Sequence, residues 1–206
     1  MNIHSLVAMS PAQSARAQAQ DQDKRTAILD AALELFVERG YFGTAVPLVA
    51  ERAGVGAGTI YRYFKSKEDL VNTLYRQVKQ SLANFVLTGV NQDVPPREIF
   101  RQLWFRLAEF ARKYPNGFAF IELHHHASYL DDESRAIEAR ILDLTRAFIM
   151  RLQVEKVVKP IAPMTLMIIV YWSFIGLTRC AQEGRLELTD EVLAQTEQCV
   201  WEAIRY

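Results

Sequence analysis

The sequence predicts an all-helical fold of about nine helices. Apolar residues recur at three- and four-residue spacing along most of the chain, and glycine or proline separates these segments. No stretch alternates apolar and polar residues as a half-exposed strand does. Half of the 206 residues are hydrophobic and 23% are charged, which is typical of a globular chain. Helices without a sheet bury their apolar faces against one another, so we expect helix-on-helix packing throughout.

The first elements follow in order from the N-terminus. Residues 1–21 are rich in Ala, Gln and Ser without helical periodicity, and we expect a flexible tail there. A helix is predicted from about Asp23, because apolar residues then recur at helical spacing until Gly40, a residue that commonly ends helices. Its inward residues are expected to be Ile28, Leu29, Ala32, Leu33 and Phe36.

Two short helices and one long helix come next. The first spans residues 46–53, with Thr44 as a cap, Pro47 tolerated in the first turn and Gly54 as the break. The second spans residues 57–64. Ser66, with Asp69 three residues later, has the pattern of a capping box and opens a long helix that reaches about Thr88.

The remaining helices are predicted from proline positions and apolar stripes. They are expected at residues 96–114, 118–130, 133–158, 164–182 and 189–204, with Pro115, Pro160, Pro163 and Gly184 between them. In the segment 133–158 the stripe expected to face inward is Ile137, Ile141, Leu144, Phe148 and Leu152.

The two short helices and their glycine-containing turn predict a helix-turn-helix, whose second helix enters the major groove of DNA. On a helical wheel, Ile60 and Phe64 share an inward face, whereas Gly58 and Arg62 point outward. Lys+Arg and Asp+Glu are equal at 24 each, so net charge says nothing about a partner. The segment 52–67 nevertheless contains only basic charges, at Arg52, Arg62, Lys65 and Lys67. Lys67 and the amides that open the long helix suggest a phosphate site.

This stretch resembles the signature of the TetR family of transcriptional regulators. The matching positions are Ala53, Gly54, Val55, Gly58, Thr59, Ile60, Tyr61, Tyr63, Phe64, Lys67, Glu68 and Leu70. The resemblance implies a helix-turn-helix DNA-binding domain at residues 22–67, of three helices. It also implies a helical ligand-binding and dimerisation domain at residues 68–206. Carried over by position, the residues that would face DNA are Thr44, Ala57, Gly58, Thr59, Tyr61, Arg62, Tyr63 and Lys67.

The resemblance also divides these positions by role. Tyr61, Tyr63 and Lys67 match positions that hold phosphates, whereas residues 57–59 and Arg62 match positions near the bases. Two residues depart from the pattern. Pro47 stands where a polar residue is common, which removes an expected base contact. Gly56 stands where Ser often caps the recognition helix, so the helix start has a weaker cap.

The C-terminal half is rich in aromatic residues, most of which are expected to be plain core. The resemblance implies a cavity among the middle helices, and apolar cavities with a few polar groups are the usual small-molecule sites. The candidate ligand-binding residues are Trp104, Leu107, Phe118, Glu122, His126, Tyr171 and Phe174. They suggest a hydrophobic or amphipathic ligand, and a cationic one if a charged Glu122 lines the cavity.

The last two helices, 164–182 and 189–204, are too apolar for a monomer surface, and we expect them to form a homodimer interface. The apolar run Met164–Leu177 has 14 residues, fewer than the about 20 that a membrane span needs. With no signal peptide visible, the sequence favours a cytoplasmic protein without membrane contact.

The leading interpretation is a repressor that binds a palindromic operator as a dimer and is released by a small hydrophobic molecule. Alternatives are a ligand-independent repressor, an activator with the same fold and, more remotely, an enzyme that uses the aromatic cavity. No nucleophile–base arrangement or phosphate loop favours an enzyme, and no cofactor is expected. The three consecutive histidines 124–126 point in different directions on a helix and cannot chelate one metal together. Glu122 and His126, four residues apart, could supply two ligands, but no third ligand is identifiable, so no metal is expected either.

Overall fold

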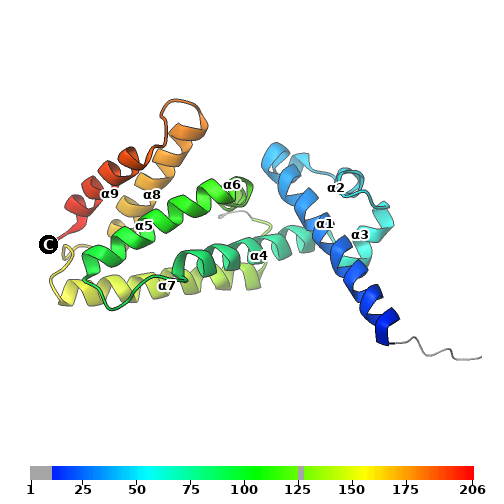
Figure 1. The fold of residues 1–206 in the computed structure, drawn as a ribbon, viewed down its shortest axis with the longest axis horizontal. Helices are drawn as coiled ribbons and strands as arrows, with labels where there is room; N and C mark the ends of the chain where they lie inside the picture. Colours follow the sequence, from blue (N-terminus) through cyan, green and yellow to red (C-terminus); the bar gives the residue numbers. More distant parts are fainter. Residues whose placement is uncertain (1–10, 125–127) are drawn as a thin grey trace, which may run out of the picture.

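The computed structural model describes residues 11–124 and 128–206, which form nine α-helices and an isolated antiparallel bridge between Val158 and Arg205 (Figure 1). The helices are α1 Pro11–Gly43, α2 Val46–Arg52, α3 Ala57–Tyr63, α4 Lys67–Leu87, α5 Pro96–Lys113, α6 Pro115–His124, α7 Asp132–Val154, α8 Pro163–Gln182 and α9 Asp190–Ile204. Figure 1 shows α1, α2 and α3 at one end of an elongated molecule, and α4 leading from them into the remaining helices. The all-helical prediction is confirmed.

The first helix is longer than predicted. It begins at Pro11, so the flexible tail expected over residues 1–21 is wrong for residues 11–21, and residues 1–10 lie outside the described part. The physical reason is composition, since Ala, Gln and Arg have high helix propensity even without an apolar stripe. The helical path breaks at Gly40, whose φ of 67° lies in the left-handed region, as the sequence predicted.

Glycine also ends α2 and α8, each through a pair of backbone hydrogen bonds. After α2, the Val55 amide donates to Ala50 and the Gly54 amide donates to Glu51, while Gly54 has a φ of 65°. This is the Schellman arrangement, which satisfies the last carbonyls of a helix and turns the chain away. Gly184 ends α8 in the same way.

Two helices in the C-terminal half have different ends from those predicted. The helix expected at residues 118–130 begins at Pro115 and is described only to His124, and residues 128–130 are a turn and loop. The helix expected at residues 133–158 ends at Val154, where Lys156 adopts a φ of 56° and a Schellman pair closes the helix. No glycine marks this end, so the sequence carried no signal for it.

The N-terminal helices share one buried core with α4 and α6. Ile60 and Phe64 are 1% and 2% exposed, which confirms their predicted inward face. They belong to a cluster that also contains apolar residues of α1 and α2, the first half of α4, and Phe120 and Ile121 of α6. The phenyl rings of Phe36 in α1 and Phe120 in α6 lie 6.1 Å apart. The packing of the helix-turn-helix therefore continues into α6.

The C-terminal helices enclose two further clusters and leave one apolar surface exposed. Trp104, Phe110, Phe118 and Phe174 lie in the larger cluster, and α7, α8 and α9 meet in the smaller one. On α7, Leu152 is buried, but Ile141 and Leu144 are 39% and 63% exposed, so the inward orientation expected for these two residues is wrong. The helices packed against α7 cover only part of its length, so apolar residues outside the covered part remain exposed.

By length and composition α8 would be able to cross a membrane. The sequence analysis counted only the 14-residue apolar run Met164–Leu177, whereas the whole helix has 20 residues. One of its faces nevertheless packs into the core through Leu166, Phe174, Ile175, Leu177 and Thr178. A core helix of a globular protein meets the same criteria.

A buried ion pair joins α5 to α9. The Glu197 carboxylate is 3% exposed and accepts two hydrogen bonds from the Arg97 guanidinium, one of them at 2.8 Å. The same guanidinium lies over the indole ring of Trp201, 5.2 Å from its centroid. A buried carboxylate is tolerated because it is paired, and removal of its cation is costly.

We therefore expect Arg97→Met to lower the free energy of unfolding by about 2–3 kcal/mol, less than a fully buried pair would lose because Arg97 is partly exposed. Urea denaturation followed by circular dichroism measures this. Arg112→Met is the control, since the Arg112–Asp190 pair is exposed on both sides and should contribute less than about 1 kcal/mol. The double variant Arg97→Met/Glu197→Gln should recover part of the loss. Equal effects of Arg97→Met and Arg112→Met would contradict this account.

Candidate nucleic-acid interface

The helix-turn-helix is formed by α2, the turn at residues 53–56, and α3. Pro47 lies in the first turn of α2, where its missing amide proton costs nothing, as predicted. Gly56 is the N-cap of α3, with a φ of −71° and no side-chain hydrogen bond to the helix. The weaker cap expected from the sequence is therefore present, and α3 is held in place mainly by burial of Ile60.

One face of α3 is open to solvent and carries most of the predicted DNA-facing residues. Ala57 and Gly58 are exposed, Thr59 is half-buried, and Tyr61 is 56% exposed. The Arg62 side chain is 70% exposed. A Cβ built at Gly58 would meet nothing within 4 Å, so the backbone there is open to close approach. This face combines a guanidinium, a phenol and a hydroxyl, which are donors suited to base edges and phosphates.

Thr44 does not belong to this face, and its predicted role is corrected. The side chain is 1% exposed, and its hydroxyl lies 3.0 Å from the Leu35 carbonyl and 2.8 Å from the Gly40 carbonyl, both in α1. The N-cap of α2 is Ala45, without a side-chain hydrogen bond, so Thr44 does not cap that helix either. Its hydroxyl instead shares its one proton between these two carbonyls near the end of α1, where helices leave acceptors unpaired.

The start of α4 lies beside α3 and contains Lys67. Ser66 caps the helix, accepting a hydrogen bond from the Asp69 amide at 3.2 Å. The Asp69 carboxylate accepts from the Lys65 amide at 2.8 Å, one residue before the donor that a capping box uses. The Lys67 ammonium lies 4.1 Å from the ring centroid of Tyr41, and partial burial lowers the pKa of Lys67. The lysine is thus positioned by an aromatic ring at the helix start.

Acidic residues of α1 contact this basic segment, which sequence reasoning missed. Arg52 bonds Glu34 at 2.8 Å and Glu38 at 3.2 Å. The Tyr63 hydroxyl donates to the Asp21 carboxylate at 2.5 Å, and this hydrogen bond raises the pKa of Tyr63. The spacing of Glu34 and Glu38, four residues apart, places both carboxylates on one face of α1, which is the only sign of this contact in the sequence. That this face lies against α2 follows only from the fold.

The predicted ligand-binding residues fall into two groups. Trp104, Phe118 and Phe174 are less than 5% exposed, and the Phe174 ring lies 5.2 Å from the ring of Trp104 and 5.9 Å from that of Phe118. Leu107 packs against the same cluster. Trp104 and Phe174 therefore form closed core rather than a cavity wall, because their rings fill the space between α5 and α8. His126 lies outside the described residues.

The other two residues, Glu122 and Tyr171, do meet. The Tyr171 hydroxyl donates to the Glu122 carboxylate, and burial together with this bond raises the pKa of Tyr171. Nearby, the Lys79 ammonium lies 3.8 Å from the Glu138 carboxylate, and burial lowers the pKa of Lys79. The Tyr75 hydroxyl is also buried, and this burial together with the nearby Glu138 carboxylate raises the pKa of Tyr75. Helices α4, α6, α7 and α8 thus contribute to one partly buried polar cluster, in which Tyr171 is 36% exposed.

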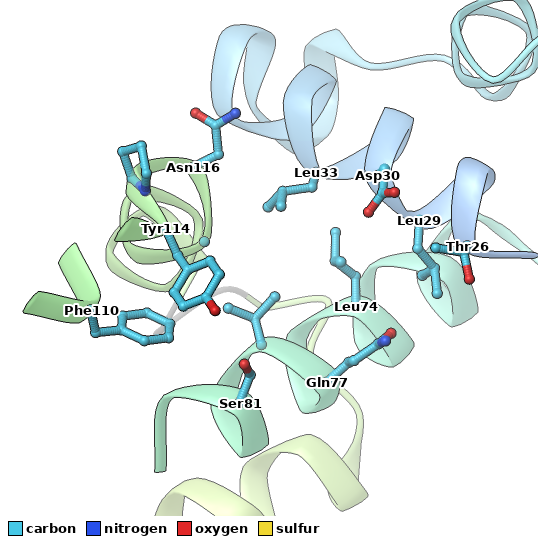
Figure 2. Close-up of a pocket in the computed structure, with 13 residues that line it drawn as sticks. Thr26, Leu29, Asp30, Leu33, Leu74, Gln77, Ser81, Phe110, Tyr114 and Asn116 are labelled. Carbon is cyan, nitrogen blue, oxygen red and sulfur yellow. The ribbon is translucent and has the colours of Figure 1, made fainter. Parts of the chain in front are cut away.

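The structure contains two cavities of interest, and Glu122 lines one of them. The first, of about 310 Å³, is at the junction of α1, α4 and the start of α6 (Figure 2). Figure 2 shows Leu33 of α1, Leu74 of α4 and Tyr114 before α6 around this space. The second, of about 250 Å³, lies between α6 and α8 and is lined by two of the predicted ligand residues, Phe118 and Glu122. Within residues 11–124 and 128–206, no group of three His, Cys, Asp or Glu side chains is arranged to hold a metal.

The exposed face of α3 and the helical second half define the class of protein, a helix-turn-helix protein with an all-helical C-terminal domain. Family models then supply the particular family. The model described as "Bacterial regulatory proteins, tetR family" matches residues 28–74, and "Tetracyclin repressor-like, C-terminal domain" matches residues 74–206. The chain belongs to the TetR family of DNA-binding transcriptional regulators.

Individual relatives agree with this family. A TetR family transcription regulator from Marinobacter aquaeolei VT8 has a TM-score of 0.81 at 24% identity, covering 91% of this chain and 98% of its own. The fatty acid metabolism regulator protein of Bacillus subtilis is 45% identical over 58 residues, 28% of this chain and 30% of its own length. The structure of AibR with isovaleryl coenzyme A and operator DNA has a TM-score of 0.67 at 22% identity, covering 86% and 96%. The chain aligns with about half or less of the length of the first curated relatives.

Proposed function

We propose that this regulator is a repressor that binds a palindromic operator as a homodimer in the cytoplasm and leaves it when a small hydrophobic molecule binds. The observation that carries the proposal is the open face of α3, with Tyr61 and Arg62 directed to solvent beside Lys67 at the start of α4. A ligand-independent repressor and an activator remain the alternatives. We propose no enzymatic activity, since the relatives described above are transcription regulators.

In the proposed complex, α3 lies in the major groove. Residues 57–59 and Arg62 approach the bases, because the open backbone at Gly58 permits close contact and a guanidinium pairs well with guanine. Tyr61, Tyr63 and Lys67 hold phosphates on either side. Lys67 is suited to this role because a lysine beside a helix N-terminus attracts anions.

The proposed dimer forms through α8, with α9 beside it. Met164, Ile168 and Trp172 follow one another at four-residue spacing on α8 and are 43%, 50% and 47% exposed. The outward residues of α9 are mostly polar, including Gln195, Gln198 and Glu202, so we assign α9 to the rim of the interface. On the other side, α7 packs beside α8 and exposes Leu144, Met150 and Val154. An apolar centre with a polar rim is the usual anatomy of such interfaces.

The proposed ligand site is the cavity between α6 and α8 together with the Glu122–Tyr171 pair. At about 250 Å³ the cavity is slightly smaller than typical ligand sites, so a ligand would have to widen it. Widening would move α6, which carries Glu122 and also contributes Phe120 and Ile121 to the core of the DNA-binding domain. This shared helix supports a mechanical connection between ligand and DNA.

The DNA contacts are tested by two substitutions with different expected effects. Arg62→Ala should cost about 1–3 kcal/mol for the operator and relax the base preference at one position. Lys67→Ala should weaken binding to all sequences alike and lower the salt slope by about one, as loss of a phosphate contact does. Selection of bound sequences from a random library, followed by binding measurements across salt concentrations, gives both quantities. If both variants bind like the original protein, α3 is not the DNA-reading element.

The dimer is tested by placing a charge on the exposed apolar face of α8. Ile168→Arg should shift the protein from dimer toward monomer, because burial of an unpaired charge is costly. Leu87→Arg is the matched control, since Leu87 is exposed to a similar extent, at 61%, but lies at the end of α4. Analytical ultracentrifugation at micromolar concentration distinguishes the two states. An unchanged dimer in Ile168→Arg, or a monomeric original protein, would contradict the proposal. A dimer should also select half-sites about one DNA turn apart.

The ligand is tested by calorimetric titration of a library of small hydrophobic compounds, and of short-chain acyl-coenzyme A thioesters such as isovaleryl coenzyme A, into free and DNA-bound protein. An inducer that lowers operator affinity a hundredfold must bind the DNA-bound protein about a hundredfold more weakly, a coupling of about 2.7 kcal/mol. Glu122→Gln should change ligand affinity, whereas Glu109→Gln, on an exposed residue of α5, should not. Equal affinity with and without DNA would exclude a compound as inducer. If no compound of any class binds, the ligand-independent repressor is the better account.

A further inference from the structure

The N-terminal part of α1 lies against the recognition helix and places a carboxylate on its polar face. Asp21 accepts a hydrogen bond from the Tyr63 hydroxyl at 2.5 Å and lies 4.0 Å from the Arg62 guanidinium. One turn further along α1, the Arg25 guanidinium stacks over the Phe64 ring at 5.4 Å. A single anionic side chain thus meets two neighbouring residues of α3 that are assigned above to DNA.

The chemistry of this contact matches that of a DNA phosphate. A tyrosine hydroxyl has one proton to donate, and at neutral pH both a carboxylate and a phosphate diester only accept. Tyr63 cannot give that proton to Asp21 and to a phosphate at the same time. The two anions would also repel one another at the short separation that a shared donor imposes.

We propose that Asp21 occupies the place of a backbone phosphate on the free recognition helix and thereby weakens the affinity of this protein for DNA of any sequence. The inference rests on the proposed function, because it requires α3 to contact DNA. Asp21 is a competing group and not a DNA contact itself. Its effect is independent of sequence because it acts on phosphate-type donors.

Exposure sets the size of the expected effect. The side chains of Arg62 and Asp21 are 70% and 57% exposed, so the contact is weak and can open when DNA approaches. Exposed pairs contribute little to free energy, and we therefore expect removal of the carboxylate to strengthen DNA binding by about two- to fivefold.

The test uses Asp21→Asn in the full chain and a fluorescein-labelled mixed-sequence DNA duplex, with anisotropy measured over a range of salt concentrations. Asp23→Asn is the matched control. It makes the same change in net charge on an exposed residue of α1, and within the described residues Asp23 forms no hydrogen bond or ion pair with α3. Asp21→Asn should bind about two- to fivefold more tightly than Asp23→Asn and show a salt slope steeper by up to about one, as for a gained phosphate contact.

A second background isolates the shared donor. Tyr63→Phe lacks the hydroxyl. In this background, the ratio of DNA affinities between Asp21→Asn and Asp23→Asn should fall to the part that comes from the 4.0 Å contact of Asp21 with Arg62. Equal binding by the two asparagine variants would overturn the inference, as would weaker binding by Asp21→Asn, which would indicate that the carboxylate positions Tyr63 for DNA. Failure of the proposed function is a separate result, in which the original protein and all variants bind no DNA at any salt concentration.

Discussion

The packing of α1 against both α4 and α6 is the constraint on which the rest of the structure depends. Buried side chains of α1 pack against α2 and α3 in one hydrophobic cluster, which also includes Phe120 and Ile121 of α6. The recognition helix is too short and too weakly capped to hold its own position, so its orientation follows from this shared core. The DNA-binding domain and α6, the helix that carries Glu122, therefore form one continuously packed unit. A displacement of α6 within it would shift the side chains of α1.

Charge is balanced locally as well as overall. Helix α1 supplies Glu34, Glu38 and Asp21 to the basic residues of the helix-turn-helix. In a protein whose positive and negative residues are equal in number, such neutralisation limits nonspecific attraction to polyanions. The exposed face of α3 then depends on shape and donor geometry as much as on net charge. This fits a regulator that must distinguish one site among many similar ones.

The C-terminal half combines a closed aromatic core with a partly buried polar cluster. Burial of Lys79, Glu138 and the Tyr75 hydroxyl is costly, and the 3.8 Å ion pair offsets only part of that cost. Glu122 and Tyr171 belong to the same neighbourhood. Polar groups inside an otherwise apolar bundle are where a ligand with one polar end would gain most, which is why the proposed ligand site is centred there and not on Trp104 and Phe174.

The sequence by itself determined the helical fold, most helix limits and the inward and outward faces of α3. These features depend on residues within about four or five positions of one another, such as Gly54 at the end of α2 or Ser66 at the start of α4. Local signals failed at Val154, where a lysine takes the place that glycine usually has, and in residues 11–21, where propensity alone forms a helix.

Outside α3, only the tertiary structure decided which of the predicted site residues are accessible and which charges meet. Thr44 is buried against α1. The rings of Trp104 and Phe174 pack edge to face in the core. Asp21 accepts a hydrogen bond from Tyr63, which lies 42 positions further along the sequence. Each of these contacts joins segments whose separation along the chain carries no periodic signal. Their partners are set by how whole helices pack, and packing depends on the summed shape of many side chains rather than on any one motif.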